Sequence, residues 1–370
     1  MINKKRLINT FKTLIRIDSL AYKEAKVMAY LGKELKKLGI RSTFQGRPAG
    51  GEVGSLIADV PGQGKRILLN AHVDTVTPGK KIKPIQDGKY IFSDGKTVLG
   101  ADDKTGVAVI LEVLRVLKEK KLKHLRLKVI FTVAEETGLV GARCLPKRVF
   151  NGEFCITLDH DRPNEIVYKA PAQQNITVKI YGKSAHAGIH PELGLNAIKI
   201  ASIAIAKMRF GRIDSETTSN IGIIEGGKAT NIIPDRVVIR GEARSHNPKK
   251  LEREIEQMKR VLTEICAKYG ARVKIKVEKV YHSFEIKKSA QVLKLASRAI
   301  IKAGLKPVYK QTGGGSDANI FNAAGIPTVI LGSGMHQVHT TKEYANINEI
   351  IKGAEVVLNM ILGGDNEKAN

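Results

Sequence analysis

The feature that most constrains this chain is an alternation of apolar runs with helical patterns, which changes its order once along the sequence. In the first part, the short apolar runs 55–60, 66–73 and 125–134 alternate with longer segments such as 103–119, whose apolar residues recur at helical spacing. Apolar runs separated by helices are typical of a largely parallel sheet that is covered on both faces. We therefore predict an α/β fold for this part of the chain.

The order of elements changes near Pro171. Beyond it, the pattern predicts a strand, a helix, two strands, a helix and a strand, which is the ferredoxin-like order. These segments are 175–181, 195–208, 219–225, 236–243, 248–269 and 272–280. The α/β pattern then resumes with a helix over 289–303. The sequence thus predicts an α/β domain formed by 1–171 and 284–370, with an α+β domain inserted over 172–283.

Composition argues against several classes of protein. The net charge of +26 could attract nucleic acid, but aromatic residues are only 5% and Trp is absent, which leaves little for base stacking. No apolar run approaches the about 18 residues of a membrane span, and the first residues lack the uninterrupted apolar segment of a secretory signal. The three cysteines are scattered and form no disulfide framework. We expect a cytoplasmic protein with no membrane segment and no specific nucleic-acid partner.

Histidine and acidic residues follow the predicted strands. His72 and Asp74 come at the end of the run 66–73 and, two residues apart in an extended chain, face the same side. Open α/β sheets bind ligands just beyond the carboxyl ends of their strands. An imidazole at this place could bind a metal ion while the neighbouring carboxylate orients it.

Two pairs of adjacent acids lie at similar places. Asp102 and Asp103 precede a helix, and because one cap needs only one of them, Asp103 is predicted as the N-cap and Asp102 stays available. Glu135 and Glu136 end the run 125–134, where a solvated turn is the alternative interpretation. Two desolvated acids repel each other, and a bound dication would remove the repulsion. Both can reach one site only where the strand breaks, and we predict that break at the Thr-Gly pair that follows them.

Two further sets of donors complete this pattern. Asp159 follows the apolar run 154–158, and both His336 and His339 follow the run 328–331 as alternative ligands. Imidazole and carboxylate donors without thiolate suit Zn²⁺, with Mn²⁺ or Co²⁺ as alternatives. Two such ions about 3.5–4 Å apart that share a carboxylate form a hydrolytic centre. The residues therefore predict a dinuclear hydrolase.

The motifs around these residues resemble the M20 family of dinuclear zinc exopeptidases and amidohydrolases, and within it peptidase T, the tripeptide aminopeptidase, and peptidase T-like proteins. The matching motifs occur in family order over nearly the whole chain and are His72-x-Asp74, Leu99 to Lys104, Glu135-Glu136-x-Gly138, Ser184 to Gly188, Gly226 to Asp235, Gly241 to Ser245, Gly314 to Asn319 and His339-Thr340-x-x-Glu343. The resemblance implies a zinc-exopeptidase-type α/β catalytic domain and an inserted ferredoxin-like domain that acts as a lid and in dimerisation.

The resemblance also implies a ligand set for two Zn²⁺ ions per subunit. His72 and Asp159 would bind one ion, and Glu136 and His339 would bind the other. Asp102 would bridge both ions, with a cis peptide bond to the next residue.

Roles in catalysis and substrate binding come from the same resemblance. Asp74 would orient the first histidine ligand, and Glu135 would be the general base that takes a proton from the attacking water. His186 would reach the active site of the partner subunit in a homodimer and stabilise the oxyanion. The substrate would be held by Asn231, by Arg244, which would grip a carboxylate, and by the loop that contains Gly314.

These roles predict an exopeptidase that acts on short peptides and releases the N-terminal residue. The alternative within the same family is an N-acyl amino acid deacylase or desuccinylase, and Arg244 would serve a carboxylate in either case. A third interpretation, a non-enzymatic basic protein that binds nucleic acid or anionic surfaces, leaves the set of ligands and base unexplained.

Overall fold

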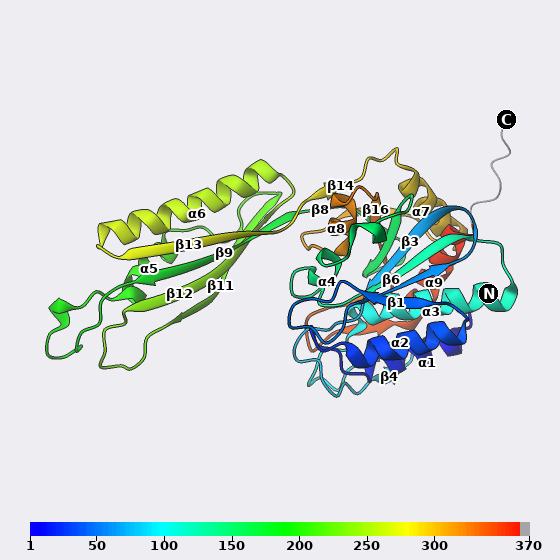
Figure 1. Ribbon diagram of the computed structural model, residues 1–370, viewed down its shortest axis with the longest axis horizontal. Helices are drawn as coiled ribbons and strands as arrows, with labels where there is room; N and C mark the ends of the chain where they lie inside the picture. The colour runs from blue at the N-terminus through cyan, green and yellow to red at the C-terminus, as the bar shows by residue number, and fades with distance from the viewer. Residues whose placement is uncertain (363–370) are drawn as a thin grey trace. The chain divides into compact units, whose positions relative to one another are not determined.

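The computed structural model describes residues 1–362 (Figure 1). The chain divides into two compact units. The first unit comprises residues 1–169 and the described residues from 285 onward, and the second comprises Ala170–Phe284. No helix within 1–362 combines the length and the apolar character that a membrane crossing requires.

The first unit is built on a large sheet with the order β1-β2-β6-β3-β7-β16-β8-β14, and β15 pairs with β8. The neighbours β6, β3, β7 and β16 run parallel, as predicted, while β1 and β2 are antiparallel to their neighbours and β8 is antiparallel to β16 but parallel to β15. The strands are Ser42–Gln45 (β1), Ser55–Val60 (β2), Gln63–His72 (β3), Leu125–Thr132 (β6), Cys155–His160 (β7), Glu165–Ala170 (β8), Phe284–Glu285 (β14), Val308–Gln311 (β15) and Thr328–Gly332 (β16).

Helices cover both faces of this sheet. On one face α3 packs against β3 and β7 and is flanked by α1 and α9. On the other face Phe321 of α8 belongs to an apolar cluster with Leu68 of β3 and Cys155 of β7. The helices are Lys4–Ile15 (α1), Ala25–Lys37 (α2), Ala101–Lys120 (α3), Val140–Arg143 (α4), Gln291–Lys302 (α7), Asp317–Ala323 (α8) and Ile347–Ile361 (α9), with a short 3₁₀ turn at Lys147–Val149. Burial on both faces explains the nearly continuous apolar character of the central strands.

A small sheet with the order β17-β18-β5-β4 lies in the same unit. Its strands are Ile85–Asp87 (β4), Tyr90–Phe92 (β5), Met335–His336 (β17) and Tyr344–Asn346 (β18). β17 and β18 are antiparallel, and the loop that joins them contains His339. This loop has a left-handed backbone at His339, with φ 63°.

The second unit is an antiparallel sheet with two helices. Its strand order is β10-β11-β12-β9-β13, and α5 and α6 pack against the sheet and against each other. Its elements are Ala172–Tyr181 (β9), Pro191–Leu193 (a 3₁₀ turn), Ala197–Ala206 (α5), Gly211–Arg212 (β10), Thr217–Gly226 (β11), Arg236–Ser245 (β12), Pro248–Lys268 (α6) and Arg272–Tyr281 (β13). Apart from the short β10, they follow the predicted ferredoxin-like order. Alternate residues of β9, such as Ile176 and Val178, fill the core below the helices.

Candidate active site and metal centre

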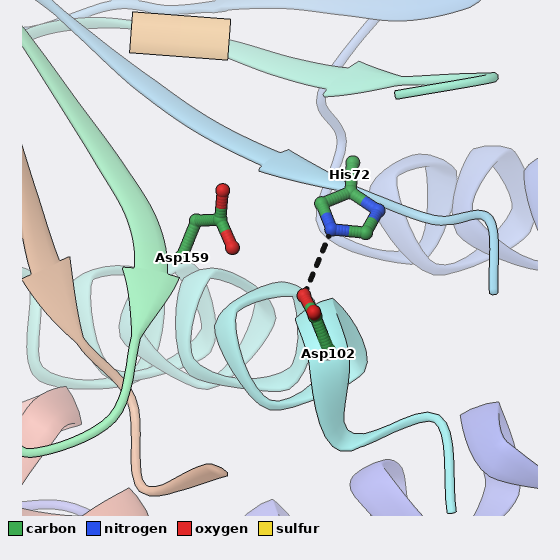
Figure 2. A group of neighbouring side chains, drawn as sticks. All are labelled: His72, Asp102 and Asp159. Carbon is green, nitrogen blue, oxygen red and sulfur yellow. Dashed lines mark hydrogen bonds and ion pairs between the residues drawn. The ribbon is translucent and has the colours of Figure 1, made fainter. Parts of the chain in front are cut away.

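The first group of candidate ligands gathers at the carboxyl ends of two neighbouring parallel strands. His72 is the last residue of β3, Asp159 lies near the end of β7, and Asp102 stands at the start of α3 (Figure 2). Their ligand atoms all lie within 4.8 Å of one another. His72 Nε2 is 3.0 Å from Asp102 Oδ1. These residues therefore lie at the edge of the sheet where open α/β folds bind ligands.

A second group shares one residue with the first. The ligand atoms of Asp102, Glu136 and His339 also lie within 4.8 Å of one another. His339 Nε2 is 3.2 Å from Asp102 Oδ2 and 3.0 Å from Glu136. The two oxygens of Asp102 thus face two different histidines, which is the arrangement that a carboxylate between two cations requires.

The two histidines that the sequence left as alternatives have different surroundings. His336 bonds to Glu349 and stacks on Tyr344, with ring centroids 4.8 Å apart. His339 alone of the two lies in a group of candidate ligands. The apolar run before them could not distinguish them, because both lie within a few residues of its end.

The backbone at Asp102 is held in an irregular conformation. Asp102 and Asp103 have non-helical torsions although they lie within the bounds of α3, and the peptide bond between them is cis, as the resemblance implied. Asp103 Oδ1 accepts a hydrogen bond from Gly106 N at 3.1 Å, which confirms its predicted capping role. Its other oxygen accepts a bond from His72 N at 3.3 Å, so this residue also joins α3 to β3.

The strand that precedes Glu135 and Glu136 breaks earlier than predicted. β6 ends at Thr132, and Ala134 has a left-handed backbone with φ 48°. The prediction that the following Thr-Gly pair supplies the break was wrong, because the chain already leaves the strand before the two acids. The early turn removes the strict alternation of a strand, so that neighbouring acids need not face opposite sides.

Asp74 links the two acids to the first histidine. Its two oxygens accept hydrogen bonds from Glu135 N at 3.0 Å and Glu136 N at 3.1 Å. Asp74 Oδ1 also lies 3.3 Å from His72 Nδ1. The Asp74 carboxylate is fully buried. It faces the imidazole of His72 and also holds the turn that carries Glu135 and Glu136.

Burial and crowding shift the protonation of these acids. Burial raises the pKa of Asp159 and of Glu135 well above the ordinary values, and nearby carboxylates raise both further. At Asp102 burial also disfavours the charge, but hydrogen bonds from His339 and His72 outweigh it and hold the pKa well below its usual range. Bonds to Asp102 and then to Glu136 raise the pKa of His339 to about 10.

The charges of these side chains indicate whether metal ions fit the site. The acids outnumber the two imidazoles, and burial makes their mutual repulsion costly. The donors are imidazole nitrogens and carboxylate oxygens in two groups with one shared member. Divalent cations would neutralise the excess of negative charge with the ligand types that Zn²⁺, Mn²⁺ or Co²⁺ accept. The residues present therefore fit two such ions.

Two of the predicted catalytic and substrate residues lie on exposed loops of the second unit. His186 is exposed, and its Nδ1 accepts hydrogen bonds from Gly188 N and Ile189 N, both at 3.2 Å. Two donors aimed at Nδ1 place the proton of the neutral ring on Nε2. The carbonyl of Asn231 accepts a bond from Ala187 N at 2.9 Å, which joins the loops of both residues.

The remaining two predicted residues are placed differently. Arg244 is on β12, where its Nε and Nη2 donate to the two oxygens of Glu242 at 2.9 and 3.0 Å. One edge of this guanidinium therefore already holds a carboxylate of the chain itself. Gly314 lies in the first unit, in the loop before α8, and its N–H donates to Thr312 Oγ1 at 3.1 Å.

Three buried carboxylates around the centre received no role from the sequence. Glu24 Oε1 accepts bonds from Tyr22 N at 2.8 Å and from Ala134 N at 2.9 Å. Asp317 accepts bonds from side chains of β3 and β6. Glu343 accepts bonds from the loop before α3 and from Asp102 N at the start of that helix. Glu343 and Asp317 belong to motifs that were noted in the sequence, but no local spacing links Glu24 to Ala134, Asp317 to its two strands or Glu343 to Asp102.

Comparison with known proteins agrees with this fold. Residues 68–363 match the peptidase family M20/M25/M40. The chain therefore belongs to this family, and together with its relatives the fold and the centre define a metallo-exopeptidase.

Its similarity to individual proteins extends over nearly the whole chain. It is 41% identical to the uncharacterized protein YqjE of Bacillus subtilis (strain 168), over 98% of this chain and 99% of that one. The crystal structure of aminopeptidase PepT from Bacillus cereus is similar at 42% identity with a TM-score of 0.86, covering 98% of each chain. A tripeptidase from Staphylococcus aureus is similar at 38% identity with a TM-score of 0.91, again covering 98% of each chain.

Proposed function

We propose that the protein is a dinuclear metal-dependent aminopeptidase that releases the N-terminal residue of short peptides, including tripeptides. The observation that carries the dinuclear centre is Asp102, whose two oxygens face His72 and His339 in two adjoining groups of candidate ligands. The choice of substrate is supported by the similarity to an aminopeptidase PepT and to a tripeptidase.

His72 and Asp159 would hold one ion, Glu136 and His339 the other, and Asp102 would contact both. Zn²⁺ suits these donors best, with Mn²⁺ or Co²⁺ as alternatives. When bound, the ions would supply Lewis acidity toward the substrate carbonyl and lower the pKa of water.

The chain's own residues move the proton in this mechanism. Glu135 lies next to both groups, and its ligand atom is within 4.8 Å of those of His72 and Glu136. Burial first, and then the neighbouring acids, raise its pKa well above the ordinary value, which suits a group that takes a proton and returns it. Glu135 would accept a proton from the attacking water and donate it to the leaving amine. Asp74 would keep Glu135 in place through the backbone bond at Glu135 N.

We further propose that two copies of the chain associate through their second units and that His186 of one copy serves the active site of the other. The protonated Nε2 of His186 is a hydrogen-bond donor, as the stabilisation of an oxyanion requires. Strand β11 offers an edge for the association, because β10 covers only Thr218 and Ser219 and no other described strand pairs with that side. Ile223 and Ile224 on this edge are 44% and 49% exposed.

Arg244, Asn231 and Gly314 are proposed to contact the peptide. Glu242 occupies one edge of the Arg244 guanidinium and fixes its plane, so that a substrate carboxylate would approach from another side. The three cysteines form no disulfide, which supports a reducing, cytoplasmic location.

The test is metal analysis of the purified protein together with a substrate panel. The panel contains Ala-Ala, Ala-Ala-Ala, N-acetyl-Ala and N-succinyl-Ala, with and without added Zn²⁺, Mn²⁺ or Co²⁺. We expect two ions per chain and release of free alanine from the N-terminus of Ala-Ala-Ala. Turnover of the acylated substrates alone would instead identify a deacylase. An Asp159→Asn variant serves as a control, because hydrolysis that survives in it comes from a contaminant.

A further inference from the structure

One short loop reaches both groups of candidate ligands. It joins β17 to β18, carries His339, and ends at Glu343, whose side chain is buried. Glu343 Oε2 accepts hydrogen bonds from Leu99 N at 2.7 Å and from Gly100 N at 2.8 Å. Glu343 Oε1 accepts a bond from Asp102 N at 3.0 Å. A single carboxylate thus binds three backbone donors of the segment that presents Asp102.

This segment depends on an outside acceptor. The first N–H groups of a helix have no partner within the helix, and the torsions of Asp102 and Asp103 are not helical. Gly100 has φ 72°, and a Cβ there would lie 2.9 Å from Thr75 Cγ2, so a larger residue would strain the backbone and crowd this side chain. Charge-assisted hydrogen bonds that N–H groups donate to a buried carboxylate are among the stronger hydrogen bonds in a protein. The position of Asp102 therefore rests on Glu343 more than on the helix that follows.

We propose that Glu343 is a positioning residue that couples the two cation positions through this loop. The inference rests on the proposed dinuclear centre. His339 contributes a donor to only one group of ligands. Glu343, four residues later, controls Asp102, which belongs to both groups. Substitution of His339 should therefore weaken the binding of one ion, whereas substitution of Glu343 should weaken the binding of both ions.

The test compares two variants by titrating the metal-free protein with Co²⁺, whose visible absorption reports the number and geometry of bound ions. The wild type is expected to bind two ions per chain. His339→Ala should keep one tight ion, held by His72, Asp102 and Asp159. Glu343→Ala should lower the affinity for both ions by about 10–100-fold, which is the usual effect of removing a group that orients ligands.

A conservative variant sharpens the result. In Glu343→Gln the amide oxygen can still accept from Leu99 N and Gly100 N, but its NH₂ group then faces Asp102 N, a donor against a donor. We expect weakened binding of both ions in this variant as well, and thermal unfolding of the metal-free protein checks that the variant is folded. If Glu343→Ala does not fold, the Gln variant carries the test. Glu349→Gln is the matched control, because the Glu349 carboxylate bonds to His336, which belongs to neither group of candidate ligands.

The outcomes separate the two proposals. Two ions bound by Glu343→Gln at wild-type affinity and with the wild-type spectrum would overturn the coupling and leave the dinuclear centre intact. Loss of a single ion in Glu343→Gln would also overturn it. A wild type that binds no Co²⁺ would overturn the centre and the coupling with it.

Discussion

Most predicted functional residues of the first unit are buried, with the exposed His339 as an exception, whereas two of those in the second unit are exposed. In the first unit, His72, Asp102 and Glu135 are buried, and further carboxylates bind the backbone turns that carry them. In the second unit, His186 and Asn231 are exposed on loops joined by a backbone bond. Groups that bind cations and move protons gain from a dry, rigid surrounding. Groups that receive a substrate or serve a second subunit must reach the surface.

The test of this contrast with the largest expected effect on activity is the replacement of Glu135 by glutamine. Glu135→Gln keeps the size of the side chain and its backbone bond to Asp74, so both metal ions should remain. The amide cannot take a proton, and kcat should fall by about 10²–10⁴-fold. Steady-state kinetics with Ala-Ala-Ala and metal analysis of the same sample measure the two effects. Hydrolysis at the parent rate would remove Glu135 from the role of base.

The second test concerns the exposed residue of the second unit. His186→Ala should abolish most peptide hydrolysis while changing the free energy of unfolding by less than about 0.5 kcal/mol, because the side chain is exposed. The control is His190→Ala, a nearby exposed histidine that pairs with Glu192, and it should keep its activity.

Mixed dimers then distinguish a shared site from a local one. His186→Ala chains combined with Glu135→Gln chains contain one active site in which both residues are intact. We expect part of the activity to return on mixing. If mixed dimers form but no activity returns, His186 does not act in the active site of the partner subunit.

The smallest expected effect concerns the buried carboxylate of Glu24 in the first unit. Burial, followed by repulsion from Asp74, raises the pKa of Glu24 to about 7 from an ordinary 4.5. The folded state therefore binds this proton more tightly than the unfolded state. The stability that the proton contributes is complete below about pH 4.5 and is lost as the pH rises to about 7.

Glu24→Gln tests this directly in the metal-free protein. The amide oxygen can keep both bonds of Oε1, and no described group bonds to Oε2. Between pH 5 and pH 7 the free energy of unfolding should decline less in the variant than in the wild type, by a difference on the order of 1–3 kcal/mol. Urea denaturation at pH 5, 6 and 7 measures it. Equal slopes in the two proteins would show that Glu24 is already ionised at pH 5.

Much of the fold could be read from local patterns. Alternating apolar runs and helical spacing predicted the parallel centre of the large sheet, and the order of elements in the second unit was equally clear. The antiparallel edges could not be predicted, because an apolar run such as β2 shows no strand direction, and its pairing with β6 is set by the packing of the whole sheet. The break before Glu135 was also missed, since a left-handed backbone at Ala134 has no signature in an alanine.

The sequence alone determined which residues could serve as ligands, because position at a strand end and donor type are properties of a few neighbouring residues. Strand-end position could not choose between His336 and His339, which only the family resemblance separated, and no role was assigned to Glu24 or Glu343 from the sequence. Their partners, Ala134 and Asp102, are 110 and 241 residues away. Only tertiary structure decides such bonds, since a buried carboxylate binds whichever backbone donors the packing brings to it, and that packing is set by the whole core.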